Sequence, residues 1–304
     1  MSCIPMNSNS KSLLLSVIVP VGDMAGRLHF LELWLQKVSN HHIEVILIHD
    51  QTYVEAATEL QELLRTVNSS KVILIQGLFG NPGGARNAGL DIAKGEWIGF
   101  WDSDDNPNIE NICKAVQAAD EQDEILIGDF TVFDLKSGAF RPQTRIIDPL
   151  NSIAMNPGIW RMIFRRENIG STKFPSLKMG EDQVFLSYLG FASKRLRFIE
   201  SIFYQYNLGS SSQLTKSPIA LRELPLASRL IFDHAIKAPN KEAIFDMQLF
   251  YRQQITILKK GDYSLKLGVL KYLGKIFVPF RFSFLVESLT ALLRVLISIR
   301  KAGI

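Results

Sequence analysis

Three aspartates, Asp102, Asp104 and Asp105, lie within four positions and directly follow the apolar run WIGFW. Carboxylates this close repel one another unless a cation or solvent lies among them. Oxygen ligands suit Mg²⁺ or Mn²⁺, which also bridge to substrate phosphates. The spacing therefore predicts a divalent-cation site at the rim of the core. The alternative is an acidic turn that caps the next helix, with Asp105 or Asn106 as the N-cap.

A second acidic pair, Glu181 and Asp182, precedes a largely apolar stretch with helical character. A carboxylate here could act as a general base that takes a proton from an attacking hydroxyl. Acidic residues in the first turn of a helix are also favoured by the helix dipole, so simple capping is the alternative.

Two further residues could contact a phosphate or a nucleoside. Arg86 lies in the glycine-rich segment GGARNAG, where the backbone can approach a ligand closely and an arginine can pair with phosphate or a nucleobase. The segment matches neither the Gly-x-Gly-x-x-Gly pattern nor the Walker A loop. Asp50 ends an apolar run, where it could form a turn or contact a nucleoside.

The elements that must position these residues alternate along the first part of the chain. Strands are predicted at 14–20, 43–48, 71–76 and 96–101, and helices at 27–38, 54–67 and 83–93. This order predicts right-handed βαβ units and an α/β fold with a mainly parallel sheet flanked by helices. Ligands bind beyond the carboxyl ends of such strands. Pro20, Asp50 and Asp102 are therefore expected at one crevice.

The rest of the chain is mixed and then mostly helical. We predict strands at 124–133 and 198–206, a short strand after 156–164, a hairpin arm or loop at 138–147, and a helix at 180–190. The Ser-rich loop after Tyr206 could be a plain polar loop or a lid that orders over a diphosphate. We expect a flexible N-terminus at 1–12, a catalytic domain at 13–215 and a helical C-terminal region at 216–304 with a break near Pro279.

Composition and charge exclude several classes of protein. The 304 residues are 47% hydrophobic and 21% charged, which is typical of a globular chain. The net charge of +4 comes from residues 264–304, which carry seven basic residues and one acidic residue, so no nucleic-acid partner is expected. Cys3 and Cys113 have no metal-ligand spacing and indicate a reducing compartment, the cytoplasm. We expect neither a signal peptide nor a membrane-spanning helix.

The last helix has its own pattern. Polar residues recur every three or four positions on an otherwise apolar stretch; they are Glu287, Thr290, Arg294, Ser298 and Lys301. With the basic charge of this segment, the pattern favours a helix that lies on the cytoplasmic face of an anionic membrane. The alternatives are a helix packed on the catalytic domain and a helix at a homodimer interface.

Taken together, these segments resemble glycosyltransferase family 2, whose members have the GT-A fold. The matching segments appear in the family's order; they are 16–20 (SVIVP), 44–50, 83–89, 102–105, 156–167 (NPGIWRMIFRRE), 180–182 and 204–214. The resemblance implies an inverting, metal-dependent hexosyltransferase of surface polysaccharide synthesis. Such an enzyme moves a sugar from a nucleotide diphosphate sugar, most commonly a UDP-sugar, to a hydroxyl of a glycan or lipid-linked acceptor.

The resemblance also implies roles for the candidate residues. Asp102 and Asp104 would form the Asp-x-Asp motif that binds Mn²⁺ or Mg²⁺ and the donor, with Asp104 as the direct ligand. Asp182 would be the general base. The other donor contacts would come from Pro20, Asp50 at the nucleobase, Arg86 beside it, Ser103, Asp105 and Tyr206.

Two departures from the family pattern leave the donor open. Gly22-Asp23 stands where a Tyr-Asn pair is common, and His49-Asp50-Gln51-Thr52 replaces Asp-Asp-Gly-Ser. Two rival functions are a sugar nucleotidyltransferase and a non-catalytic protein of the same fold that docks at membranes. Segment 22–27 is a poor version of the Gly-rich, basic loop that the first requires, and the presence of Asp104 and Asp182 argues against the second.

Overall fold

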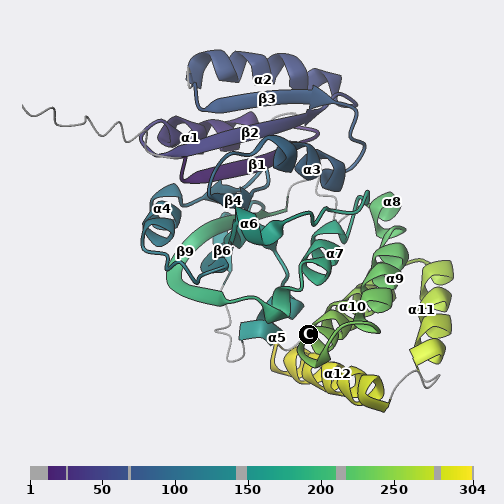
Figure 1. The fold of residues 1–304 in the computed structure, drawn as a ribbon. Helices are drawn as coiled ribbons and strands as arrows, with labels where there is room; N and C mark the ends of the chain where they lie inside the picture. The colour runs from purple at the N-terminus through teal and green to yellow at the C-terminus, as the bar shows by residue number, and fades with distance from the viewer. Residues whose placement is uncertain are drawn as a thin grey trace, which may run out of the picture.

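A computed structural model of the chain describes residues 13–24, 27–67, 70–141, 149–209, 217–276 and 282–302. These residues form a nine-stranded sheet with helices on both faces and a group of helices beside it (Figure 1). The strand order is β3-β2-β1-β4-β8-β6-β9-β5, and β7 pairs with β6.

The first half of the sheet is built as predicted from βαβ units. Its elements are β1 (Leu15–Val21), α1 (Leu28–Val38), β2 (Ile43–Asp50), α2 (Val54–Val67), β3 (Val72–Gly77), α3 (Pro82–Ile92) and β4 (Trp97–Phe100). β1 pairs in parallel with both β2 and β4, and β2 pairs in parallel with β3. Because all four strands run the same way, their carboxyl ends share one edge, which confirms the predicted parallel arrangement of these strands.

The second half of the sheet is mixed. Its elements are β5 (Asn106–Pro107), α4 (Ile109–Gln117), β6 (Ile125–Asp134), β7 (Ala139–Arg141), α5 (Pro149–Met155), the 3₁₀ turn η1 (Ile159–Arg161), β8 (Met162–Arg165), α6 (Arg166–Ile169), α7 (Glu181–Tyr188), the 3₁₀ turn η2 (Phe191–Ser193) and β9 (Leu196–Leu208). β8 runs antiparallel to β4 and β6, whereas β9 runs parallel to β6. The predicted hairpin arm contains β7; residues 142–147 of that prediction lie outside the described residues.

Alternate residues of the strands enter two apolar cores, one on each face of the sheet. In β1, Val17 and Val19 join the core that is completed by α1, α2 and α4. Ile18, between them, joins the core that contains α3 and α7. This alternation follows from the two-residue repeat of a strand. In β4 it points Phe100 toward α7, where it meets Phe185.

Five helices follow the sheet: α8 (Pro218–Leu221), α9 (Leu224–Ala235), α10 (Asn240–Lys260), α11 (Tyr263–Ile276) and α12 (Phe282–Ala302). The core around Phe185 continues through Phe245 and Phe250 of α10 to Phe284 of α12. Helices α9 and α10 therefore bury apolar surface against α7, beside which they lie in Figure 1. The predicted break near Pro279 falls outside the described residues.

The polar stripe predicted on the last helix faces the protein at two positions. Glu287 of α12 is 6% exposed, and the Ser298 hydroxyl accepts a hydrogen bond of 2.7 Å from the Asn151 side chain. The outward face is apolar and consists of Val286, Leu289, Leu293, Leu296 and Ile297, which are 46–62% exposed. The helix therefore packs on the protein with one face and leaves an apolar face outside. Within the described ranges no helix is long and apolar enough to cross a bilayer.

The strand that carries the acidic cluster depends on Phe100. Its ring centroid lies 5.7, 5.0 and 5.6 Å from those of Phe164, Phe174 and Phe185. We expect Phe100→Ala to lower the free energy of unfolding by about 3–5 kcal/mol, because the change leaves a cavity in a closed core. Urea titration measures this loss. The matched change Phe140→Ala, at a residue that is 60% exposed, should cost far less; equal losses would contradict this account of the core.

Candidate active site at the carboxyl edge of the sheet

The acidic cluster, residues 102–105, follows β4 and is held by β9. The backbone N–H of Asp102 donates to the Tyr204 hydroxyl at 2.9 Å. The backbone N–H of Asn207 donates to Oδ1 of Asp105 at 2.7 Å, and its side-chain amide donates to the carbonyl of Asp104 at 2.8 Å. Two residues of β9 therefore fix the backbone of the cluster. Sequence reasoning did not single out Asn207, because no local pattern reveals a partner about a hundred residues away.

The acidic cluster does not cap the helix that follows it. Asn106 pairs with Gln205 in the two-residue strand β5, and α4 begins only at Ile109. The N-cap of α4 is Asn108, whose side chain accepts from the Asn111 N–H at 3.1 Å. The predicted alternative, a cap at Asp105 or Asn106, is therefore wrong, because β9 takes this segment into the sheet.

The carboxylates of the cluster are buried to different degrees. Oδ2 of Asp104 accepts from the Arg27 guanidinium at 2.9 Å. Burial and the charge of Asp102 raise the pKa of Asp104 in spite of Arg27. Burial and its two acidic neighbours raise the pKa of Asp105 well above the ordinary value. Ser103, between them, is also buried. Because burial and mutual repulsion disfavour the charged forms of these carboxylates, a positive charge placed beside them would be strongly stabilising.

Arg86 joins the acidic cluster to the second acidic pair. It lies one turn into α3, whose N-cap is Asn81. Its Nη1 donates to Oε1 of Glu181 at 2.7 Å, and its Nη2 donates to Oδ1 of Asp102 at 3.1 Å. The guanidinium is nearly buried, with 7% of the side chain exposed. Two acidic segments 79 positions apart thus share one cation.

Asp50, predicted to contact a nucleobase beside Arg86, holds the turn after β2 through hydrogen bonds. Its Oδ1 accepts from the backbone N–H and the hydroxyl of Thr52, and its Oδ2 accepts from the Gly80 N–H at 2.6 Å. Burial alone would raise the pKa of Asp50, but these hydrogen bonds together lower it. His49 is buried and contacts the Tyr53 carbonyl at 3.1 Å, in agreement with a structural role. The structure thus shows the turn-forming role of Asp50, and the nucleobase contact stays a prediction.

Glu181 and Asp182 open α7. The residue before them, Gly180, has a φ of +86°, and a Cβ there would lie 2.8 Å from the Cβ of Ala227 in α9. Only glycine fits this position without strain. Burial raises the pKa of Glu181 to about 7 although Arg86 opposes the rise. Burial also raises the pKa of Asp182, against the opposing charges of Arg86 and Arg252. A carboxylate with a raised pKa is suited to proton transfer near neutral pH.

The remaining predicted residues lie along the same edge. Pro20 is the penultimate residue of β1, and Tyr206 lies in β9. The Tyr206 ring stacks on Trp160, with centroids 5.7 Å apart and planes 12° apart. Tyr206 is thus held in the sheet, because β9 continues to Leu208. The predicted lid falls mainly on residues 210–216, which are outside the described residues.

The carboxylate oxygens at this edge are ligands that a hard cation prefers, although protein side chains alone do not complete a metal site here. In the described part of the chain, no three His, Cys, Asp or Glu side chains are arranged to hold a metal ion. Asp102 keeps 35% of its side chain exposed, and Asp104 keeps 18%. Mg²⁺ usually takes one or two carboxylates and completes its shell with water and substrate phosphates. Asp102 and Asp104 match that requirement.

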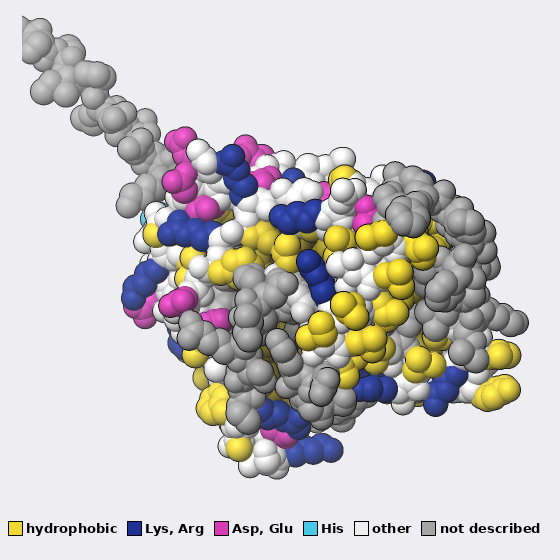
Figure 2. All heavy atoms as spheres, turned by 90° about the horizontal axis from the view of Figure 1, so that it is seen from below, with side chains coloured by type: hydrophobic (Ala, Val, Ile, Leu, Met, Phe, Trp, Pro, Cys, Tyr) yellow, Lys and Arg dark blue, Asp and Glu magenta, His cyan; other side chains and the backbone are white. Residues whose placement is uncertain are grey.

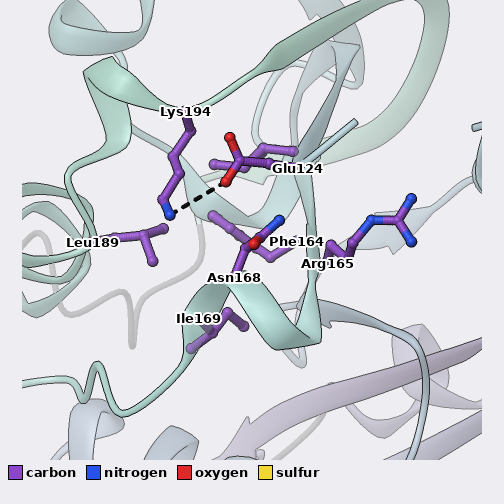
Figure 3. Close-up of a pocket in the computed structure, with 8 residues that line it drawn as sticks. Glu124, Phe164, Arg165, Asn168, Ile169, Leu189 and Lys194 are labelled. Atoms are coloured by element: carbon purple, nitrogen blue, oxygen red, sulfur yellow. Dashed lines mark ion pairs between the residues drawn. The ribbon is translucent and has the colours of Figure 1, made fainter. Parts of the chain in front are cut away.

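A small pocket elsewhere in the molecule does not compete with this edge. It lies beside Phe164, Ile169 and Leu189, and an ion pair of 3.4 Å between Lys194 and Glu124 borders it (Figure 3). Its enclosed space is too small to hold even a water molecule. Ligand sites are usually larger, about 300–1,000 Å³. It also adjoins the start of β6 and the end of β8, away from the acidic cluster.

The raised pKa of Glu181 predicts a pH dependence of stability. Its ordinary value is 4.5, and in the folded chain it is about 7. The free energy of unfolding should fall as the pH rises from about 4.5 to 7, because the native carboxyl keeps a proton that the unfolded chain releases. Asp104, Asp105 and Asp182 act in the same direction. Urea titrations at several pH values should show a shallower fall in Glu181→Gln. Glu59→Gln, at an exposed position of α2, should keep the wild-type slope.

Both the sequence and the fold of the chain are similar to those of known proteins. The model of the family "Glycosyl transferase family 2" matches residues 16–181. EpsH of Bacillus subtilis is 25% identical over 211 residues, which are 64% of this chain and 60% of that protein. An uncharacterized glycosyltransferase of Haemophilus influenzae is 24% identical over 267 residues, with 85% of this chain and 98% of that protein covered.

The fold is shared with a solved structure. The crystal structure of Staphylococcus aureus TarS 1–349 in complex with UDP-GlcNAc has a TM-score of 0.62 at 19% identity, with 95% of this chain and 92% of that chain covered. The similarity includes the C-terminal helices. Since the family model also matches more than half of the sequence, the chain belongs to glycosyl transferase family 2.

Proposed function

We propose that the chain transfers a sugar from a nucleotide diphosphate sugar to an acceptor hydroxyl, with inversion at the anomeric carbon. The observation that carries this proposal is the bridge formed by Arg86 between Asp102 and Glu181. It brings the donor-side carboxylates and the segment of Asp182 to one edge of the sheet. An inverting transfer needs both: charge stabilisation at the leaving group and a base on the opposite side.

The donor side consists of Pro20, Asp50, Arg86, 102–105 and Tyr206, all at the carboxyl edge. Asp102 and Asp104 would hold Mn²⁺ or Mg²⁺. Such an ion neutralises negative charge that builds on a leaving diphosphate. The presence of UDP-GlcNAc in the TarS structure supports a UDP-sugar as donor. Arg86 donates a hydrogen bond to Asp102 and so orients its carboxylate.

The acceptor side is built on α7. Asp182 takes the proton of the acceptor hydroxyl as the new glycosidic bond forms. Its burial raises its pKa, so it accepts a proton more readily than an exposed aspartate does. Gly180 and α9 fix the backbone of this segment. Residues 13–215 thus supply the reacting groups, and 216–304 supply the helices that hold them; the acceptor is a hydroxyl of a glycan or lipid-linked glycan.

We further propose that α12 places the enzyme on an anionic membrane surface. Apolar side chains gather on the face of the molecule where α12 lies (Figure 2). Val286, Leu289, Leu293, Leu296 and Ile297 are half-exposed there. The segment 264–304 carries an excess of six basic residues in sequence. Apolar burial combined with attraction to anionic lipid is the basis of interfacial helix binding. Such a location suits a lipid-linked acceptor.

Removing either carboxyl charge tests the transfer reaction. We expect Asp182→Asn to slow release of UDP from a UDP-sugar by about 10²–10⁴-fold, because the base is lost. Asp104→Asn should abolish the Mn²⁺ dependence of the same assay. Asp91→Asn, an exposed change in α3, is the matched control. Wild-type rates in the first two variants would contradict the mechanism. Pyrophosphate exchange would instead indicate a nucleotidyltransferase, and donor binding without turnover would indicate a non-catalytic protein.

The membrane proposal is tested with vesicles that contain phosphatidylglycerol. The double variant Leu289→Ser/Leu293→Ser should reduce cosedimentation at least about tenfold, since each buried leucine contributes about 1.5–3 kcal/mol. Leu33→Ser, at a 55% exposed position of α1, should bind like the wild type. If vesicle binding stayed unchanged and the variant instead altered the oligomeric state, the apolar face would be a dimer interface.

A further inference from the structure

Arg27 reaches the acidic cluster from the segment before α1, whereas Arg86 reaches it from α3. Arg27 precedes α1 and lies at the end of the connection from β1, where its backbone N–H donates to the Met24 carbonyl at 2.9 Å. Its Nη1 lies 2.9 Å from Oδ2 of Asp104, and the two side chains are only 15% and 18% exposed. This is a partly desolvated, charge-assisted hydrogen bond, which is stronger than an exposed ion pair.

The two candidate metal ligands therefore each have a guanidinium on one oxygen. Arg86 contacts Oδ1 of Asp102 and is shared with Glu181. Arg27 contacts Oδ2 of Asp104. Arg86 is nearly buried and bound on two sides, so it belongs to the framework of the site. Arg27 approaches from the connection between β1 and α1, outside the sheet, and forms an ion pair with Asp104.

A divalent ion and the Arg27 guanidinium cannot both occupy Oδ2 of Asp104. They would overlap in space, and their like charges would repel each other at short range in a poorly solvated site. A diphosphate offers the guanidinium another partner, since arginine pairs with phosphate oxygens through two parallel hydrogen bonds. The connection after β1 lies at the carboxyl edge, where the diphosphate is proposed to bind.

We propose that Arg27 pairs with Asp104 in the free protein and competes with a divalent metal ion for this carboxylate. The competition ends when a diphosphate group binds the Arg27 guanidinium in place of Asp104. This inference rests on the proposed function, because it takes Asp104 as a metal ligand. Metal binding to the free protein is therefore weak, and it becomes strong once the nucleotide has moved Arg27. Arg27 then accounts for part of the coupling between metal binding and nucleotide binding. This coupling is reciprocal, so each ligand strengthens the binding of the other by the same factor.

Calorimetric titration of the full chain with Mn²⁺, with and without UDP, tests this competition. Without UDP, Arg27→Gln should bind Mn²⁺ about tenfold more tightly than the wild type or better, because a charge-assisted hydrogen bond no longer has to be broken. UDP should then strengthen Mn²⁺ binding by a smaller factor in Arg27→Gln than in the wild type. Arg65→Gln, an exposed change in α2, should behave as the wild type. Arg27→Lys keeps the charge and should keep the weak Mn²⁺ affinity.

The outcomes separate this inference from the proposed function. If Asp104→Asn weakens Mn²⁺ binding but Arg27→Gln does not tighten it, the competition is refuted and the metal site stands. If neither the wild type nor Arg27→Gln binds Mn²⁺ with or without UDP, both the competition and the metal-dependent reaction are refuted. Should Arg27→Gln fold poorly by circular dichroism, Arg27→Lys decides instead: tighter Mn²⁺ binding in that variant would overturn competition by charge.

Discussion

The arrangement of the site depends on one buried cation, Arg86. Its guanidinium holds Asp102 at the end of β4 and Glu181 at the start of α7, and it is almost closed to solvent. A buried arginine must be paired, because an uncompensated charge away from water is very costly. The two acidic segments are therefore tied to α3 and to each other. Any sugar donor at the crevice meets an edge whose carboxylates are already positioned by this residue.

The site as a whole contains more carboxylates than cations. Asp104, Asp105, Glu181 and Asp182 all have raised pKa values, chiefly because burial disfavours their charged forms. The folded protein tolerates this excess because β9 fixes the cluster through backbone hydrogen bonds and because arginines approach from several elements. Burial of these four carboxylates thus works against their charged forms and lowers the local stability where they are ionised. A donor that brings a metal ion and a diphosphate would change this balance directly.

The C-terminal helices also pack against the elements that carry these carboxylates. Gly180 fits closely against α9, and the core that contains Phe100 of β4 extends to Phe250 of α10. Glu181 and Asp182 at the start of α7 consequently lie at a junction between the sheet and the helical group. α12 then closes the group with one face and leaves an apolar face outward, so a single helix serves both packing and, in our proposal, docking on the membrane.

The sequence by itself determined the alternation of strands and helices, the parallel carboxyl edge, and the placing of Asp50 and Asp102 on that edge. These features follow from local hydrophobic periodicity and from the handedness of βαβ units. The tertiary structure alone decided that Arg86 pairs with Glu181, that Arg27 covers Asp104, that Asn207 holds Asp105, and that Glu287 points inward. Each of these depends on contacts between segments far apart in the chain, such as the 95 positions that separate Arg86 from Glu181. No local pattern encodes such a pairing, because it arises only when the packed elements bring the side chains together.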